Sequence, residues 1–405
     1  MQISHHESDR LSFMSVISLA ERQSFRPAPG SIGVVLRDFR LGGSERVAIG
    51  LANYWSSRGI EVTLVVGRLE GPLSALVDRS IRIVDLGLKP RLGDKRLAWS
   101  LAFGARRVFC NKPVDACYIP GNSHWPVVPL LKTLPPACAP RIVAQVSSPV
   151  CRANRSRLAQ RVYDWRMRWL LKQADTITTL SDTLARETRD IVGCARVEVV
   201  PLPALWDEGR RSPVPDGCKT ILAAGRLVRI KGFDLLIKAF RGVASADPDA
   251  SLTICGDGPE RSTLEALVSA LDLSGRVTFT GYVPSIRPFL DQARLFVLSS
   301  HCESFGAVLL EALAAGRQVV STRCSPAVES LMTSPLTGLI VPTRDEAALA
   351  EALSALLAET PPEGAELARL VAPFHVSHGG EVFLALMQRE TGSRAWRQPV
   401  LRAAL

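Results

Sequence analysis

Short apolar runs alternate with longer segments of helical periodicity from residue 31 onward. Residues 32–36 are predicted to form the first strand, residues 44–58 a helix that ends at Gly59, and residues 61–66 the next strand. This alternation is typical of βαβ units, whose strands lie parallel in one sheet. Further strands of this first series are expected at residues 81–84, 116–119, 142–146, 176–179 and 197–200.

A charged stretch punctuated by prolines interrupts the alternation, and a second series of strands and helices follows it. The pattern therefore predicts an α/β protein made of two Rossmann-like domains that face each other across a cleft. Strands of the second series are expected at residues 220–224, 252–255, 277–280, 295–298, 319–321 and 339–341. The predicted parts are a disordered extension (1–29), an N-terminal domain (30–200), a linker (201–218), a C-terminal domain (219–375) and a final helix with a tail (376–405).

Composition favours a globular enzyme with an anionic partner. The chain has 405 residues, of which 47% are hydrophobic and 22% charged, and its formal net charge is +10. Such a charge fits nucleic acid, an anionic membrane surface or anionic small molecules. Nucleic acid is disfavoured, because no basic run is interleaved with stacking aromatic side chains.

The cysteines and the apolar runs bear on location. Nine cysteines without a C-x-x-C pair indicate free thiols in a reducing compartment, with neither a disulfide framework nor a metal site. No run of about 18 apolar residues predicts a membrane span, and residues 1–29 lack the cleavage signal that secretion requires. We therefore expect a cytoplasmic protein, either free or peripheral on the cytoplasmic face of a membrane.

Two cations flank the expected start of a helix after the first strand of the second domain. Arg226 and Lys231 lie in a glycine-bounded segment, residues 225–232, that leads into this helix. Free N–H groups at a helix start favour an anion, and both cations could bond a diphosphate. The alternative is that both are solvated surface charges. Neither domain has G-x-G-x-x-G after its first strand, which disfavours a dinucleotide oxidoreductase.

Two glutamates, Glu303 and Glu311, stand eight residues apart after a buried strand. If the whole segment were helical, its rise would separate them by roughly 12 Å along the axis. That is about the span from the ribose of a nucleotide to a sugar beyond its diphosphate. Gly306, near the helix start, would permit close approach by a ligand. By itself the pair means little, because most such pairs are solvated helix residues.

Taken together, these segments resemble the large family of retaining glycosyltransferases with the GT-B fold, the group-1 glycosyl transferases. The resemblance covers residues 31 to about 386, and its motifs occur in the family's order and approximate spacing. The motifs are residues 41–46 with residues 58–62, Ala174-Asp175, Leu180-Ser181, residues 225–240, Gly256-Asp257-Gly258-Pro259, residues 279–282 and residues 303–311.

The resemblance implies a site that binds a UDP- or GDP-sugar donor without a cofactor or metal ion. Three residues would act on the reacting groups: Arg226 and Lys231 on the diphosphate, and Glu303 near the transferred sugar. Other donor contacts would come from Gly43 across the cleft, Tyr282 beside the base, the backbone at Phe305 and Gly306, and Glu311 on the ribose. The N-terminal domain would carry the acceptor, and a final helix would cross back to it.

The implied activity is retaining transfer to a hydroxyl of a glycan or a lipid-linked acceptor, in the biosynthesis of cell-surface polysaccharide or glycolipid such as lipopolysaccharide. We expect a front-face displacement, because no second carboxylate is securely placed as a covalent nucleophile. Two alternatives stay open. The chain could hold a nucleotide sugar or a partner without turnover, or it could be an epimerase or a phosphorylase on the same fold.

The acceptor side departs from the family pattern. Gln145 stands where many relatives have a histidine, and Leu202 where they have an asparagine. His124 could replace the missing histidine, or it could be a packed residue beside Trp125.

One predicted helix is basic and rich in tryptophan. At 100° per residue, its cations fall within about 60° of arc, beside an apolar stripe. Such a helix could seat the N-terminal domain on anionic lipid, or its tryptophans could pack against the sheet. The cations are Arg157, Arg161, Arg168 and Lys172, and the stripe is Leu158, Val162, Trp165 and Trp169.

Overall fold

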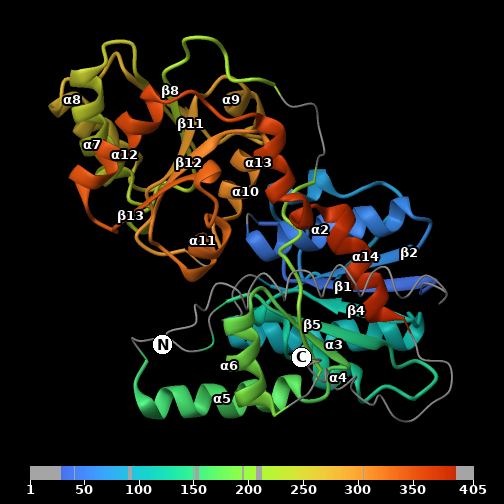
Figure 1. Cartoon of the computed structure of the whole chain (residues 1–405). Coiled ribbons are helices and arrows are strands. Elements are labelled where there is room, and N and C mark those ends of the chain that lie inside the picture. Colours follow the sequence, from blue (N-terminus) through green and yellow to red (C-terminus); the bar gives the residue numbers. More distant parts are fainter. Residues whose placement is uncertain are drawn as a thin grey trace, which may run out of the picture.

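The computed structural model describes residues 29–40, 42–89, 94–148, 150, 155–193, 196–206, 212–303 and 305–388. Within them, the chain forms two α/β domains, each built on its own parallel sheet (Figure 1). Almost all of the extension expected at 1–29, and the tail from residue 389, lie outside the described residues.

The N-terminal domain has a seven-stranded sheet in the order β3-β2-β1-β4-β5-β6-β7, and all of its neighbouring strands pair in parallel. The expected strands are confirmed to within one residue at each end. The strands are β1 (Ser31–Leu36), β2 (Glu61–Val66), β3 (Arg82–Asp85), β4 (Ala116–Ile119), β5 (Arg141–Val146), β6 (Thr176–Thr179) and β7 (Val197–Val199).

Helices cover both faces of this sheet. Alternate residues of β1 point to opposite faces, so Val34 packs beneath α2 and Val35 packs beneath α3. Gly33 lets α3 approach closely, because a Cβ there would lie 2.4 Å from the Phe109 ring. The helices are α2 (Gly43–Ser57), α3 (Asp94–Asn111), α4 (Val127–Leu131), α5 (Arg157–Leu171) and α6 (Asp182–Val192), with short 3-10 turns η1 (Pro72–Leu76) and η2 (Asn122–His124).

The C-terminal domain has a six-stranded parallel sheet in the order β10-β9-β8-β11-β12-β13. Helices α7, α8 and α12 contribute to the core on one face of this sheet, and α10 and α13 to the core on the other. The strands are β8 (Thr220–Ala224), β9 (Ser251–Cys255), β10 (Val277–Gly281), β11 (Leu295–Leu298), β12 (Gln318–Thr322) and β13 (Gly338–Val341). The helical elements are η3 (Arg229–Lys231), α7 (Phe233–Ala246), α8 (Arg261–Ala270), α9 (Arg287–Asp291), α10 (Ala307–Ala314), α11 (Pro326–Leu331), η4 (Pro335–Thr337), α12 (Glu346–Ala358), α13 (Gly364–Leu370) and η5 (Ala372–Phe374).

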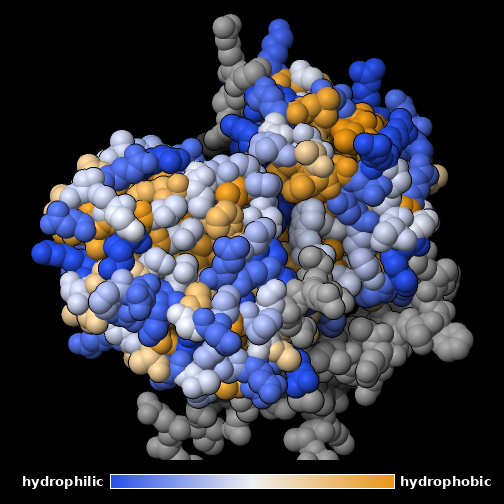
Figure 2. Space-filling view, turned by 90° about the horizontal axis from the view of Figure 1, so that it is seen from above, coloured by the Kyte–Doolittle hydropathy of each residue, from blue (hydrophilic) through white to orange (hydrophobic). Residues whose placement is uncertain are grey.

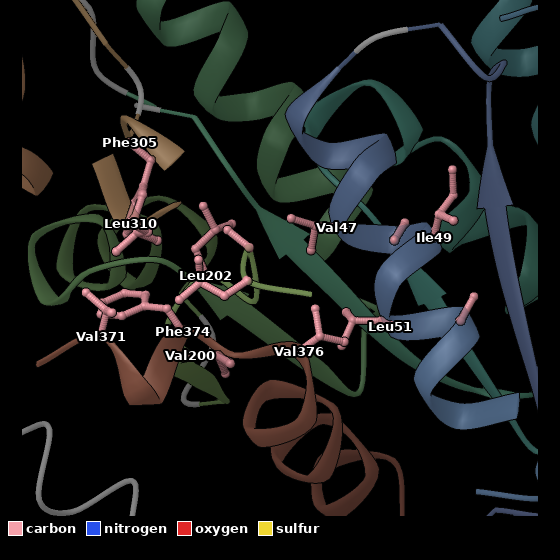
Figure 3. Close-up of a cluster of buried hydrophobic side chains, with 14 of the residues drawn as sticks. Val47, Ile49, Leu51, Val200, Leu202, Phe305, Leu310, Val371, Phe374 and Val376 are labelled. Carbon is pink, nitrogen blue, oxygen red and sulfur yellow. The ribbon is translucent and has the colours of Figure 1, made fainter. Parts of the chain in front are cut away.

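One hydrophobic cluster joins the two domains (Figure 3). Val47 of α2 and Leu310 of α10 belong to it, together with Leu202 from the segment between the sheets. Backbone pairing between Leu205 and His375 adds a bridge beside this cluster. The domains are therefore held together by a continuous apolar core.

The last helix, α14 (Val376–Met387), packs against the N-terminal domain. Phe383 meets the rings of Trp55 and Tyr118 edge-on, with ring centroids 6.4 and 5.0 Å away. The Tyr54 hydroxyl donates a hydrogen bond of 2.7 Å to Glu381. The chain thus leaves the C-terminal domain and ends, within the described residues, on the N-terminal one.

Hydrophilic residues cover much of the face seen from above, where apolar side chains gather in separate patches (Figure 2). Within the described ranges, no helix combines the length and the apolar character that crossing a bilayer would require.

Candidate functional site

Three glycines stack at the carboxyl edge of the second sheet, where parallel α/β sheets place their ligand sites. Gly225, Gly256 and Gly281 follow or end the adjacent strands β8, β9 and β10. The Gly256 N–H donates to the Gly281 carbonyl at 2.8 Å, and a Cβ on Gly256 would lie 1.9 Å from the Gly225 oxygen. Only glycine fits there, so main-chain atoms line this edge.

Lys231 is held at the same edge by the turn that precedes α7. Gly232 adopts φ +63, and a Cβ there would lie 2.2 Å from the Ser299 carbonyl oxygen. The Ser299 hydroxyl donates to the Lys231 carbonyl at 3.0 Å. The turn therefore lies directly against the end of β11, with the lysine side chain close to Gly225.

Lys231 and Glu303 form an ion pair. The ammonium group lies 2.5 Å from Oε1 of Glu303, which also accepts a hydrogen bond of 2.8 Å from the Ser300 hydroxyl. The two side chains are 27% and 12% exposed. The structure thus brings together two of the three residues that were expected to act on the reacting groups. They are 72 positions apart in the sequence.

Arg226 lies five residues before Lys231, and its side chain is exposed. Among the described residues, no side-chain hydrogen bond or ion pair is found for its guanidinium. The guanidinium is therefore free to bind an anion at the carboxyl edge of the second sheet, next to Gly225.

The segment from Glu303 to Glu311 is not helical from end to end, so the 12 Å separation based on a continuous helix does not apply. Helix α10 begins at residue 307, and Gly306 caps it at φ +78, the left-handed region that favours glycine. The Phe305 side chain is 8% exposed and packs on Phe374 at 5.9 Å. Its ring is therefore part of the core, and the backbone is what this position can offer a ligand.

Glu311 of the C-terminal domain contacts Arg46 of α2 in the N-terminal domain. Their side chains, 28% and 40% exposed, approach to 3.9 Å. Burial raises the pKa of Glu311, and the nearby Arg46 charge opposes that rise. The Arg46 guanidinium also lies over the Trp206 ring, 5.6 Å from its centroid. Gly43 begins the same helix, three residues before Arg46.

Small polar residues face this helix start from neighbouring strands of the first sheet. The Ser44 and Ser147 hydroxyls lie 3.3 Å apart, and the Ser147 N–H donates to Asn122 at 3.1 Å. A Cβ on Gly121, at φ +70, would lie 2.8 Å from the Ser44 hydroxyl. Together with Arg46, these residues are additions to the candidate site. Ser44 and Arg46 lie in the glycine motif, but no spacing in the sequence marks the others.

His124 does not replace the missing acceptor-side histidine. Its side chain is 1% exposed, accepts the Arg37 N–H at 3.1 Å through Nε2 and contacts the Pro120 carbonyl through Nδ1. Burial lowers its pKa to about 4, so the imidazole is neutral. Gln145 is equally buried and accepts the Tyr118 hydroxyl at 2.6 Å. Both residues are structural.

The remaining candidate, Tyr282, follows Gly281 and is 52% exposed. It lies at the edge of the sheet where the three glycines meet. Among the described residues, no hydrogen bond joins its side chain to another candidate residue. In the part of the chain that the structure describes, no three His, Cys, Asp or Glu side chains gather where they could hold a metal ion.

Two family models match the chain, one in each domain. Residues 206–369 match "Glycosyl transferases group 1" and residues 42–204 match "Glycosyl transferase 4-like domain". Among curated proteins, a lipopolysaccharide core biosynthesis glycosyltransferase, LpsE of Rhizobium meliloti, is 38% identical over 145 residues, which is 36% of this chain and 41% of the relative. The chain spans about a third to a half of the length of LpsE and of three other curated relatives that it matches.

Solved structures share the fold over nearly the whole molecule. The lipopolysaccharide outer core galactosyltransferase WaaB, without ligand, superposes with a TM-score of 0.64 at 16% identity, covering 88% of this chain and 98% of WaaB. Anabaena Alr3699/HepE in complex with UDP superposes with a TM-score of 0.65 at 17% identity, covering 88% and 95%.

Proposed function

Since the chain belongs to the group-1 glycosyl transferases and has the GT-B fold, we propose that it transfers a sugar from a nucleoside diphosphate to an acceptor hydroxyl with retention of configuration. The observation that carries the proposal is the ion pair of Lys231 and Glu303 at the carboxyl edge of the second sheet, in the domain whose Glu311 also contacts Arg46 of the N-terminal domain. Cations and carboxylates of this kind suit a diphosphate with a sugar at either end.

The donor we propose is a UDP-sugar, with a GDP-sugar as the second candidate. Structures of Anabaena Alr3699/HepE, which share this fold, contain UDP and UDP-glucose. The diphosphate would bind Arg226, Lys231 and the free amides at the start of α10, while Glu311 would accept hydrogen bonds from the ribose. Tyr282 would border the base, and Gly43 would face the phosphates from the other domain.

The reaction we propose is a front-face displacement. The bond from the anomeric carbon to the leaving diphosphate breaks, the acceptor oxygen bonds to that carbon on the same face, and the acceptor proton moves to the leaving phosphate. Arg226, Lys231 and the α10 amides would stabilise the charge that grows on that phosphate. Fixed donors of this kind contribute about 2.7 to 4 kcal/mol each in other enzymes, and no metal ion is needed for this role.

Glu303 would orient hydroxyl groups of the transferred sugar. In the structure it pairs with Lys231, so donor binding would place the phosphate at the lysine and the sugar at the carboxylate. For the acceptor we propose a glycan or lipid-linked glycan of a cell-surface polysaccharide, because relatives in sequence and in fold are named for lipopolysaccharide biosynthesis.

Nucleotide release tests this function. The purified protein would be mixed with UDP- or GDP-sugars, with and without acceptor extract, and the freed nucleotide measured. Release that requires acceptor supports transfer. Binding without release would show a non-catalytic binder, and interconversion of free donors would show an epimerase. The anomeric proton coupling of the product would report retention or inversion, and trapping of a sugar on any Asp or Glu would overturn the front-face route.

A further inference from the structure

Helix α5 buries only one of its faces. Met167, Leu170 and Leu171 are buried against the core of the N-terminal domain. At 100° per residue, the stripe of Leu158, Val162, Trp165 and Trp169 points in nearly the opposite direction. These four side chains are 73%, 59%, 69% and 40% exposed, so the expectation that the tryptophans pack on the sheet is wrong.

The apolar surface continues onto the neighbouring helix α3. The ring of Trp169 meets the ring of Trp99 at a centroid distance of 5.9 Å. One turn further along α3, Phe103 is 60% exposed. Isolated apolar side chains on a surface need no explanation, but a continuous stripe over two helices indicates an interaction site.

Cations border the stripe on both sides. On one side lie Arg157, Arg161, Arg168 and Lys172, and on the other lies Arg166, all of them exposed. The only acid of the helix, Asp164, accepts a hydrogen bond from Gln160 and lies on the side of the cation row that is away from the stripe. The exposed half of α5 is therefore an apolar ridge with positive borders.

We propose that this surface, α5 with Trp99 and Phe103 of α3, docks on an anionic lipid bilayer. Tryptophan places an apolar ring and a polar N–H at the level of the headgroups, while leucine and valine reach the acyl boundary. The arginines and the lysine then meet lipid phosphates, each contributing to attraction. Because the surface belongs to the N-terminal domain, docking brings that domain to a membrane without requiring a bound donor.

Charge favours lipid over a second copy of the chain. Two copies that met through this stripe would bring their rows of cations together, and the helix offers only Asp164 to compensate them. An anionic bilayer supplies the opposite charge along the whole row.

Vesicle flotation tests the proposal. The full chain, without nucleotide, would be mixed at low salt with vesicles of phosphatidylcholine alone or with about a third of phosphatidylglycerol. We expect binding to the anionic vesicles only, and its loss at high salt. Arg157→Ser with Arg161→Ser should weaken binding about thirtyfold, the equivalent of two surface cations. Val162→Ser with Trp165→Ser should weaken it at least as much.

Control variants change exposed residues elsewhere. Lys238→Ser with Arg241→Ser on α7 removes the same charge, and Leu370→Ser on α13 removes an exposed leucine. Both should float like the parent protein. The proposal is wrong if the parent protein does not bind the anionic vesicles, or if the α5 variants bind them as the parent does. It is also wrong if no protein floats and sedimentation shows a dimer of the parent that the α5 substitutions convert to a monomer.

Discussion

Arg46 of the N-terminal domain and Glu311 of the C-terminal domain approach each other to 3.9 Å where the two domains meet. Arg46 is 40% exposed and Glu311 is half-buried, and at 3.9 Å the pair contributes about 0 to 1 kcal/mol. Such a weak contact can yield to a nucleotide whose ribose takes the place of the arginine at the carboxylate. Trp206, from the segment between the sheets, lies under Arg46 and would keep it at the cleft.

Acidification should weaken nucleotide binding through Glu311. Burial raises the pKa of this carboxyl, and only its ionised form is a pure acceptor for ribose hydroxyls. The affinity for UDP is therefore highest above the raised pKa of Glu311, and it falls as the pH drops through that pKa. Glu311→Gln should bind UDP about 10- to 100-fold more weakly at neutral pH and lose this part of the pH dependence. Calorimetry at several pH values measures both, with Glu351→Gln on α12 as the control.

Glu303→Gln should separate sugar recognition from diphosphate binding. The substitution removes the carboxylate that pairs with Lys231, which leaves the lysine available for phosphate. We expect UDP to bind as tightly as before or tighter, while the transfer rate falls about 10²- to 10³-fold. Calorimetry with UDP and a transfer assay give the two values. A parallel loss of both would place Glu303 on the diphosphate instead.

Chelation should leave transfer unchanged. The proposed site meets the charge of the leaving phosphate with Arg226, Lys231 and helix amides, which need no cation. Transfer rates with and without EDTA, after dialysis against the chelator, test this point. A rate that falls and returns on addition of Mg²⁺ or Mn²⁺ would contradict it.

Buried His124 should make the protein sensitive to mild acid. Its pKa is lowered from 6.5 to about 4, so the unfolded chain takes up a proton that the native imidazole refuses. The free energy of unfolding should fall by about 3 kcal/mol as the pH drops from 6.5 toward 4. Urea unfolding of His124→Gln should start from a lower stability at pH 7 and show a shallower decline. An equal decline in both proteins would rule out His124 as the cause.

Removal of the Phe383 ring should loosen the last helix. This side chain is fully buried against Trp55 and Tyr118 of the N-terminal domain. Phe383→Ala should cost about 3 to 5 kcal/mol in urea unfolding, and Phe383→Leu clearly less, because leucine leaves a smaller cavity. If both variants were as stable as the parent protein, α14 would not contribute to the core that joins the domains.

The strands were predictable because a parallel strand buried on both faces is a short run of residues that are mostly apolar or β-branched. Residues 116–119, 176–179, 220–224 and 295–298 were placed without error for this reason. The stripe on α5 was also found, but periodicity shows only that apolar residues share a face. It does not tell which face meets the core.

The contacts of the site could not be predicted, because they depend on how distant segments meet. Lys231 and Glu303 come together because η3 lies against the end of β11, and Arg46 reaches Glu311 because the two domains pack against each other. The separation calculated for a continuous helix from Glu303 to Glu311 was wrong. Gly306 adopts a left-handed conformation before α10, and the periodicity of the sequence does not show it.

Diphosphate binding by Arg226 and Lys231 is tested by calorimetric titration of UDP and GDP into the protein and its Arg226→Ala and Lys231→Ala variants. Lys238→Ala and Arg241→Ala, on the exposed side of α7, serve as controls of equal charge. We predict that each site variant binds the preferred nucleotide about 10- to 100-fold more weakly, while both controls bind it like the parent. Unchanged affinity in both site variants would contradict the claim that these two cations hold the diphosphate.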